Sequence, residues 1–368
     1  MAEINIKRFV DINILANVTR TTSGTRGTLV LYTPEGTNGV ITQYSKYSDA
    51  TDVDNDNYLN PTNFVETLKY LEIFFAHGGS AVELIQGTAY SSVTLDMLKN
   101  LDTEKILVGF VVPAADVIAA CTAIIALAQN MNSDTTIYGI NQKILFIRTE
   151  DETISTNVSY LAMKYSNVIG AEMTMAAYVS QIDVYKQNTV NDYAFTSETI
   201  DFEDITNEQL TTILNNNMNV DVSLGNVSRD VGGNLKDGSD LVNTFVRLVL
   251  HQTLTNRLLD LLVQKIKNST GVAQIYSAIT QELEAYRSSG YYSLDKVWEA
   301  DDLSVVLNQQ QYTIITKGTA LIDGYYVKVM PYASLIEQER AARKAPYIYI
   351  ILADQYGIRQ ITINGEVI

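Results

Sequence analysis

The sequence predicts a mixed α/β (α+β) protein, with strands at both ends of the chain and a strand–helix–strand region between them. Three observations carry this prediction. The first fourteen residues alternate between apolar and polar side chains, which is the period of a half-buried strand. Through the middle, short apolar runs alternate with longer helical patterns. Two long amphipathic helices and a series of short strands close the chain.

The N-terminal segment has a clear strand pattern. Five apolar side chains fall on one parity, and polar side chains fall on the other. The apolar positions are Ile4, Ile6, Val10, Ile12 and Ile14. A strand at the end of a chain frays unless it pairs with another strand. The pattern therefore predicts a strand that has one buried face and needs a partner.

The middle of the chain indicates α/β layering. Buried strands are predicted at 28–32, 81–86, 105–112 and 143–148. One helix is predicted between Pro61, which supplies a start, and Gly78, which begins a Gly-Gly stop. A second helix is expected at 114–131, where Cys121 should be a small buried apolar residue.

Two polar stretches interrupt these elements. Residues 45–60 are rich in Asp and Asn, which is typical of a loop. Residues 185–238 are polar as well, and we expect an irregular connection there with a short helix near 207–216.

The C-terminal part begins with two strongly amphipathic helices, one starting near Asp240 and the other ending at Gly290. Strands are predicted at 312–316, 324–330 and 347–352, and a closing strand carries Ile358, Ile361 and Ile363. Between them, Ser334 and Glu337 match a capping box that opens a charged helix with the sequence SLIEQERAARK.

Composition argues against several classes of partner. The net charge of −16 repels phosphate backbones, so direct nucleic-acid binding is not expected. No stretch reaches the roughly 18 uncharged apolar residues of a membrane span, so no membrane partner is expected. Tyrosine is abundant, with 23 copies against one tryptophan. This bias favours residues placed where surfaces meet.

Groups that titrate or bind metals are scarce. With two histidines and one cysteine, a Cys/His zinc site would need carboxylates to complete it. The string Asp52–Asp56 is similar to the start of a calcium loop, but Asn57 and Asn63 stand where the turn glycine and the bidentate glutamate belong. There is no P-loop, nucleophile elbow or HExxH motif. We therefore expect no catalytic, cofactor-binding or metal-binding residues, no cofactor, and no enzymatic function.

Strands at both termini allow two interpretations. Exposed terminal strands are aggregation hazards unless a partner takes them, so each end could complete the sheet of a neighbouring subunit. Alternatively, the two ends could pair within one subunit. The residues alone favour neither interpretation.

The order of elements after residue 240 resembles the C-terminal domain of contractile tail sheath proteins from phages and R-type pyocins. A long helix (LVNTFVRLVLHQTLTNRLLDLLV) is followed by a second helix that ends in Gly, a strand that ends in Pro (YYVKVMPY), a short charged helix and closing strands. The helix FVETLKYL, which runs through Gly78-Gly79-Ser80 into the strand AVEL, also resembles this family.

The resemblance implies an inner, sheath-type domain built from residues 1–20 and 235–368, and an outer α/β domain at 21–234. It implies stacked rings around an inner tail tube, with terminal arms linking neighbours. The N-terminal strand and the closing strands would be those arms. The short helix would face the tube through Glu337, Glu339, Arg340, Arg343 and Lys344.

The family resemblance also implies a setting and partners. The chain would be a virion tail component assembled in the host cytoplasm, and it would contract to drive the tube through the host envelope for genome delivery. Its partners would be other copies of itself, the inner tail tube protein, and baseplate and tail terminator proteins. Two alternatives remain: another virion structural protein, such as a tail tube or baseplate component, and an α/β enzyme that uses carboxylates alone.

Overall fold

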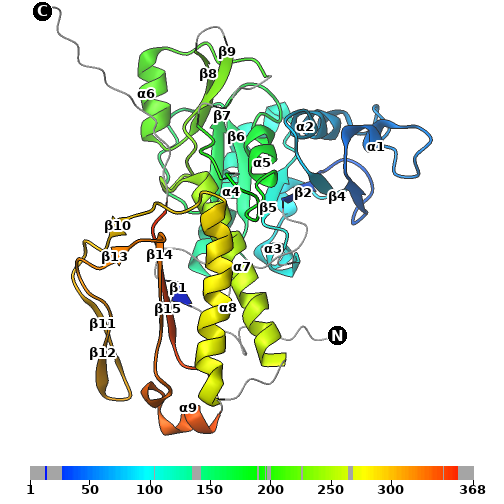
Figure 1. Ribbon diagram of the computed structural model, residues 1–368. Coiled ribbons are helices and arrows are strands. Elements are labelled where there is room, and N and C mark those ends of the chain that lie inside the picture. The colour runs from blue at the N-terminus through cyan, green and yellow to red at the C-terminus, as the bar shows by residue number, and fades with distance from the viewer. Residues whose placement is uncertain are drawn as a thin grey trace, which may run out of the picture.

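The computed structural model describes residues 13–14, 27–102, 104–134, 142–188, 190–194, 196, 200–224, 227–263, 268–342 and 344–354. Figure 1 shows two regions: a large sheet with its helices, and a long helical pair beside a smaller sheet.

The large sheet contains eight strands in the order β3-β4-β2-β5-β6-β7-β8-β9. The strands are β2 (Thr28–Tyr32), β3 (Ile41–Tyr44), β4 (Ala81–Ile85), β5 (Leu107–Phe110), β6 (Ile144–Thr149), β7 (Leu161–Tyr165), β8 (Asn219–Leu224) and β9 (Val227–Val231). The six strands from β4 to β8 are parallel, and the edge strands β3 and β9 are antiparallel to their neighbours.

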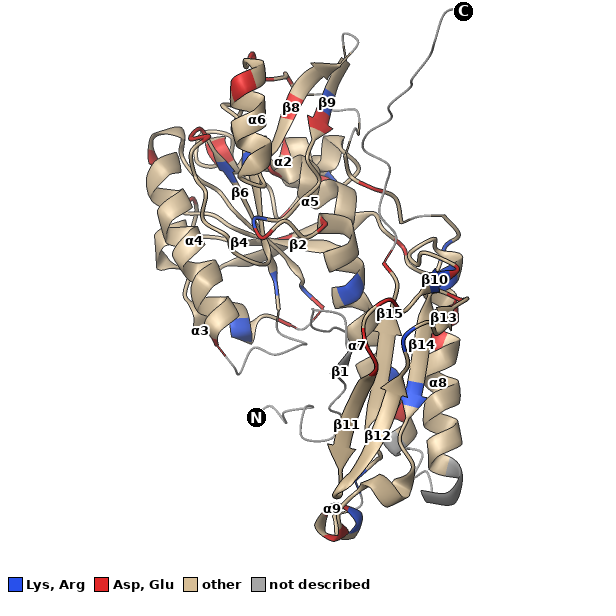
Figure 2. Ribbon diagram, turned by 90° about the vertical axis from the view of Figure 1, so that its left-hand side faces the viewer, with Lys and Arg blue, Asp and Glu red and all other residues tan. Residues whose placement is uncertain are grey.

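Helices cover both faces of this sheet (Figure 2). The helices α3 (Leu95–Asn100) and α4 (Val117–Ser133) lie on one side, and α2 (Val65–Ala76) and α5 (Met173–Ser180) lie on the other. The central strands β5 and β6 are buried at every position, as expected for parallel strands covered on both faces. Near the edges, α1 (Tyr47–Thr51) follows β3, and α6 (Asn207–Asn215) precedes β8.

The four strands predicted for the middle of the chain are confirmed as β2, β4, β5 and β6, and both predicted helices form as α2 and α4. Cys121 is buried, as expected, and its thiol lies 3.1 Å from the carbonyl oxygen of Arg148. The short helix near 207–216 is confirmed as α6. The ring of His77 lies 2.8 Å from the carbonyl oxygen of Ile73, near the end of α2.

The prediction of an irregular connection over 185–238 is wrong, because this stretch contains the strands β8 and β9. Two of their residues, Asp221 and Asp230, are directly opposite each other and fully buried. Lys164 on β7 lies 2.9 Å from Asp221 and 3.2 Å from Asp230. A charged residue can be buried in a strand only when it is paired with an opposite charge. Here that partner, Lys164, lies more than fifty positions away in the sequence.

The second region begins with two long helices, α7 (Leu241–Val263) and α8 (Asn268–Ser288), which pack against each other. The remaining strands are β1 (Asn13–Ile14), β10 (Lys296–Val297), β11 (Leu303–Leu307), β12 (Gln310–Ile315), β13 (Ala320–Leu321), β14 (Tyr325–Val329) and β15 (Ile348–Leu352). They form a three-stranded sheet, β1-β15-β14, and two separate pairs, β10-β13 and β11-β12. One hydrophobic core runs through both regions of the molecule, because buried residues of α7 and α8 are continuous with those of the large sheet.

Candidate assembly surface

The three-stranded sheet brings segments from the two ends of the chain together. Strand β14 pairs antiparallel with β15, and β1 pairs parallel with the other edge of β15. The register places Asn13 opposite Tyr349 and Ile14 opposite Ile350. Among the described residues, therefore, the N-terminal segment and β15 pair within one chain.

Most of the predicted arm residues lie outside the part of the chain that the structure describes. Of the five apolar N-terminal positions, only the backbone of Ile14 is described, in β1. The predicted positions Ile4, Ile6, Val10 and Ile12 lie outside the described residues. The closing-strand positions Ile358, Ile361 and Ile363 also lie outside them.

The two faces of the β14–β15 pair have different environments. The side chains that pack on the main core come from one face, at Tyr325, Val327, Val329, Ile348, Ile350 and Leu352. On the other face, Tyr326 and Ile351 belong to a small second cluster with Ile315, Leu321 and Trp298. All five residues of β14 are only half-buried. The sheet is thus firmly attached on its helical side and thinly covered on the other.

The end of β15 is anchored by Asp354. Arg247 of α7 lies 3.2 Å from its carboxylate, and the Tyr291 hydroxyl donates a hydrogen bond of 2.9 Å to it. Both charged side chains are about nine-tenths buried, with exposures of 11% for Arg247 and 9% for Asp354. Burial and the nearby Asp354 carboxylate raise the pKa of Tyr291, so its hydroxyl remains a donor. The pair fixes the point at which the chain leaves the sheet.

A row of tyrosines connects α8 with β14. The ring centroids of Tyr286 and Tyr291 are 6.5 Å apart, those of Tyr291 and Tyr292 5.0 Å, and those of Tyr292 and Tyr325 5.6 Å. Tyr286, Tyr291 and Tyr292 are buried. These three tyrosines therefore pack in the interior of the subunit. Tyr347, by contrast, is 40% exposed.

The charged helix predicted after Ser334 is shorter than expected and begins later. A 3₁₀ turn at Tyr332–Ser334 comes first, and α9 covers only Glu337–Ala341. The capping-box prediction with Ser334 as N-cap is wrong, because Leu335 is buried with extended backbone angles, which interrupts the helix. Ile336 is the N-cap residue, and its backbone N–H donates to the Glu339 carboxylate.

The charged residues of this segment have different surroundings. Glu339 accepts hydrogen bonds from the Tyr347 hydroxyl at 2.7 Å and from Lys344 at 3.2 Å. The Tyr347 hydrogen bond is the largest cause of the lowered pKa of Glu339. Glu337 is exposed, and Arg340 is half-buried. Arg343, the fifth predicted residue, lies outside the described residues.

The hairpin β11–β12 stands beside this segment (Figure 1), and only its second strand was predicted. Its turn residues Asn308 and Gln309 both have positive φ angles, and the Asn308 amide donates to the carbonyl oxygen of Ala333. Val306 is 71% exposed. The valine-containing apolar run LSVVL and the Asn-Gln turn were the available signals for this hairpin.

In the large sheet, the place where doubly wound folds usually bind ligands is closed by the chain itself. That place lies at the carboxyl ends of β2 and β5, where the strand order changes direction. The Glu35 carboxylate accepts from the backbone N–H groups of Glu66 and Thr67, at 3.1 and 2.8 Å. On the β5 side, the hydroxyl of buried Tyr70 accepts a 3.1 Å hydrogen bond from the Val112 N–H. The N–H groups at the start of α2 therefore already bind a carboxylate of the protein itself.

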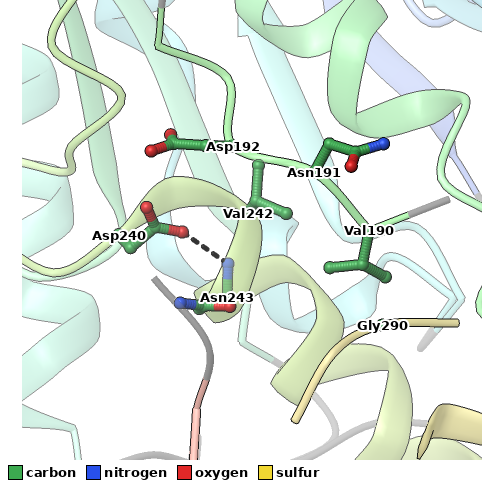
Figure 3. Close-up of a pocket in the computed structure, with 7 residues that line it drawn as sticks. All are labelled: Val190, Asn191, Asp192, Asp240, Val242, Asn243 and Gly290. Carbon is green, nitrogen blue, oxygen red and sulfur yellow. Dashed lines mark hydrogen bonds between the residues drawn. The ribbon is translucent and has the colours of Figure 1, made fainter. Parts of the chain in front are cut away.

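Among the hollows of the described part of the chain, two lie against helices α7 and α2. One, of about 120 Å³, lies between the 190–192 segment, the start of α7 and Gly290 (Figure 3). Its Asp240 is occupied in capping α7 through the Asn243 N–H at 2.8 Å. The other is an open hollow of about 460 Å³ between the segment around α1 and helix α2. Within the described ranges, no three His, Cys, Asp or Glu residues are placed to hold a metal ion.

One described helix segment, 114–133, is long and apolar enough to cross a membrane by length and composition alone. Core helices of soluble proteins share this property, and seven α4 residues are buried in the core.

Residues 243–367 match the family model described as E217 tail sheath protein gp31-like, C-terminal domain. This match begins within α7 and includes the three-stranded sheet apart from β1. No curated protein sequence matches the chain.

Solved structures share the fold over most of the chain. A chain in the contracted baseplate of the anti-feeding prophage aligns with a TM-score of 0.52 and 13% identity, covering 97% of this chain and 98% of the other. The sheath tail protein from Desulfitobacterium hafniense aligns with a TM-score of 0.51 and 10% identity, covering 81% of this chain and 93% of the other. The predicted mixed α/β fold class is confirmed, and so is the resemblance: residues 243–367 match a tail sheath C-terminal domain model, and the chain shares the fold of these two proteins.

Proposed function

We propose that the protein is a structural subunit of a contractile tail sheath. It polymerises around an inner tail tube and contracts to drive that tube through the host envelope for genome delivery. The observation that carries this proposal is the three-stranded sheet, because it joins both ends of the chain in the region that matches the sheath family.

The two regions take different roles in this proposal. Residues 1–20 and 235–368 form the inner domain, and residues 21–234 form the outer domain. In the C-terminal region, the half-buried strands and the sheet edges that no described strand pairs with suit a surface that other subunits complete. The closed sheet of the outer region suits a structural module, since Glu35 and Tyr70 fill its ligand position.

The arms link subunits by exchange of strands. Strand β1 pairs with β15 over two positions within the chain. A neighbour's N-terminal arm can make the same parallel pairing, with the same backbone hydrogen bonds, on the same edge of β15. Ile4, Ile6, Val10, Ile12 and Ile14 extend that pairing, and Ile358, Ile361 and Ile363 bring the C-terminal arm to a second neighbour. Such exchange needs no change of fold, because each subunit contains both the β15 edge and the N-terminal strand that pairs with it.

The segment around α9 faces the tube. Glu337, Arg340, Arg343 and Lys344 supply weak contacts of both signs, whereas Glu339 holds the segment together through Lys344 and Tyr347. An exposed ion pair contributes only about 0–1 kcal/mol, so each contact releases easily when contraction moves the subunit outward. Repetition over many subunits makes the sum large enough to hold an extended sheath.

The remaining partners follow from this assembly. The sheath starts on a baseplate, ends at a tail terminator protein and is built in the host cytoplasm before it becomes part of the virion. Its energy is stored in metastable packing between subunits.

A baseplate or tail tube component is the second candidate. The alignment with a chain from a contracted baseplate assembly favours the first of these. A carboxylate-based α/β enzyme has less support, because the usual ligand position of the sheet is occupied by the chain's own Glu35. Negative-stain microscopy separates these alternatives: long hollow polymers indicate a sheath, and discrete particles indicate a baseplate component or an enzyme.

Deletion of residues 2–15 tests the sheath proposal. We expect a folded subunit that no longer polymerises, because most buried side chains lie elsewhere. Sedimentation measures the polymer, and thermal melting checks the fold. If the truncated chain sediments as the intact chain does, the N-terminal arm does not link subunits.

A further inference from the structure

Helix α4 (Val117–Ser133) lies on the outside of the large sheet, and its 17 residues include no charged side chain. Figure 2 shows neither blue nor red between its ends. The other described helices of twelve or more residues, α2, α7 and α8, all carry charged residues. A helix face in water normally carries such residues. The composition of α4 is therefore unusual for a helix on the surface.

The inner side of α4 explains only half of this composition. Seven of its residues are buried: Val117, Ala120, Cys121, Ile124, Leu127, Ala128 and Met131. Helix α4 packs against β6, where the Cys121 thiol meets the carbonyl oxygen of Arg148. This packing accounts for an apolar inner face, whereas the outer face could carry charges without disturbing it.

The outer side of α4 is exposed and carries no charge between the capping residues Asp116 and Asp134. Exposed positions recur along this side of α4, at Ile118, Ala119, Thr122, Ala126 and Gln129. Ile118 is 75% exposed, among the most exposed large apolar side chains of the described residues. Small side chains let another chain approach closely, and an uncharged face requires no ion to leave water when it is covered.

We propose that this outer face of α4 contacts a second copy of the chain in the sheath polymer, an inference that rests on the proposed function because it requires a polymer. The net charge of the chain is the reason for choosing a second copy as the partner. Every copy carries a net charge of −16, so like charges oppose most contacts between copies. Electrostatic repulsion between two copies is smallest where their surfaces carry no charge. Asp116 and Asp134 lie only at the two ends of this face.

The size of the face fits a contact that exists only in the assembly. A helix of this length spans about 25 Å, and one side of it buries far less than the roughly 1,200 Å² of a stable interface. The contact therefore does not hold a dimer in solution. It forms where other links, such as the arms, already hold copies side by side.

Thiol labelling tests this proposal with two matched single variants, Ile118→Cys on α4 and Val53→Cys on the loop after α1. The two positions are almost equally exposed, at 75% and 71%. The native Cys121 is 2% exposed, and burial raises the pKa of its thiol to about 11, so it contributes little background. The rate of maleimide labelling is measured for the monomer and for the assembled sheath.

We expect assembly to slow labelling at Ile118→Cys about tenfold or more, because interface cores exclude water, and to change labelling at Val53→Cys less than about twofold. Equal rates at both positions, or equal slowing at both, would overturn the α4 contact while leaving the sheath function in place. If no polymer forms at all, the sheath function and the α4 contact fail together.

Two further measurements complete the test. Vesicles of phosphatidylcholine and phosphatidylglycerol are added to the monomer, and protection of Ile118→Cys by them would assign the face to a membrane and overturn the proposal. The variant Ile118→Glu should polymerise more slowly than Val53→Glu while both melt like the unmodified chain. Equal polymerisation of these two variants would also contradict the contact.

Discussion

The eight-stranded sheet and the three-stranded sheet differ in how completely the chain covers them. Every residue of β5 and β6 is buried beneath helices on both sides. In β14, by contrast, every residue is half-buried. The first sheet also buries paired charges, Lys164 with Asp221 and Asp230, whereas the Lys344–Glu339 pair beside the second sheet is partly exposed.

This difference separates stability from assembly. A sheet whose faces and ligand position are filled by its own chain stabilises the subunit and offers little to a partner. A sheet with open edges and thin cover contributes less to the subunit and more to its contacts. Mutations in the first region should therefore change unfolding, and mutations in the second should mainly change assembly.

The largest effect should follow from Lys164→Met. The substitution leaves Asp221 and Asp230 opposite each other, buried and without the lysine that lies between them. We expect the free energy of unfolding to fall by about 3–5 kcal/mol, because two buried carboxylates lose the lysine charge that lies 2.9 and 3.2 Å from them. Chemical denaturation measures this loss. As a control, Lys186→Met removes an exposed pair with Asp183 and should cost less than about 0.5 kcal/mol. Equal losses for both variants would show that the buried cluster does not stabilise the sheet.

The large sheet should also show a pH dependence with two opposite slopes. Burial raises the pKa of Glu172 from its ordinary 4.5 to about 7, with Arg148 partly opposing this shift. Between these values the unfolded chain loses the proton while the folded chain keeps it, so stability falls as pH rises from 4.5 to 7. Burial lowers the pKa of Lys143 from 10.5 to about 7, so stability should rise with pH from 7 to 10.5.

Two variants test these slopes separately. Glu172→Gln should remove the decline below pH 7 and add roughly 2–3 kcal/mol at neutral pH. Lys143→Met should reduce the rise above pH 7 and leave the lower range unchanged. Part of the rise should remain, because burial also lowers the pKa of Lys236 from 10.5 to about 8. Denaturation curves across the full pH range measure both. An unchanged profile in either variant would mean that its group does not govern that range.

A moderate effect is expected where β15 ends. Asp354→Asn removes the negative charge that Arg247 and Tyr291 contact. We expect a loss of about 1–2 kcal/mol in unfolding free energy, since the pair is mostly buried but not completely so. Polymer formation should suffer more than stability, because this residue directly precedes the proposed C-terminal arm. Normal polymers from a clearly destabilised subunit would assign Asp354 to the subunit core alone.

The smallest effect on stability is expected at α9. The double variant Arg340→Glu and Lys344→Glu reverses charges on a partly exposed segment, so the free energy of unfolding should change by less than about 1 kcal/mol. Extended sheath around the tube should nevertheless become rare, while contracted-type sheath still forms without the tube. Microscopy of assembled tails decides the matter, and normal extended tails would place this segment away from the tube.

Local sequence patterns were enough to predict many of the helices and strands. The buried strands β2, β4, β5 and β6 are short apolar runs, and α7 and α8 keep a helical period over several turns. These elements follow from hydrophobic periodicity alone. Strands β8 and β9 could not be found in this way, because their charges are neutralised by Lys164 from a distant strand.

The candidate assembly surface was only partly predictable. The resemblance indicated the order of helices and strands after residue 240, but it did not indicate that Leu335 would interrupt the charged helix. Nor did it indicate the hairpin β11–β12, whose two-residue turn uses Asn308 and Gln309 in place of the usual glycine. Pairing of the two chain ends depends on contacts far apart in the sequence, so the residues alone left it open.

A disulfide between the arm and β15 tests the central claim most directly. Asn13 and Tyr349 are opposite each other in the parallel pairing of β1 with β15, so the double variant Asn13→Cys and Tyr349→Cys places two thiols at paired positions. Oxidation of the monomer should give a disulfide within one chain. Oxidation of the assembled sheath should link different chains and give a ladder of covalent multimers on a non-reducing gel, whereas each single variant should give none. If the double variant yields only single-chain disulfides in the assembled state, the arm stays with its own subunit and strand exchange does not hold the sheath together.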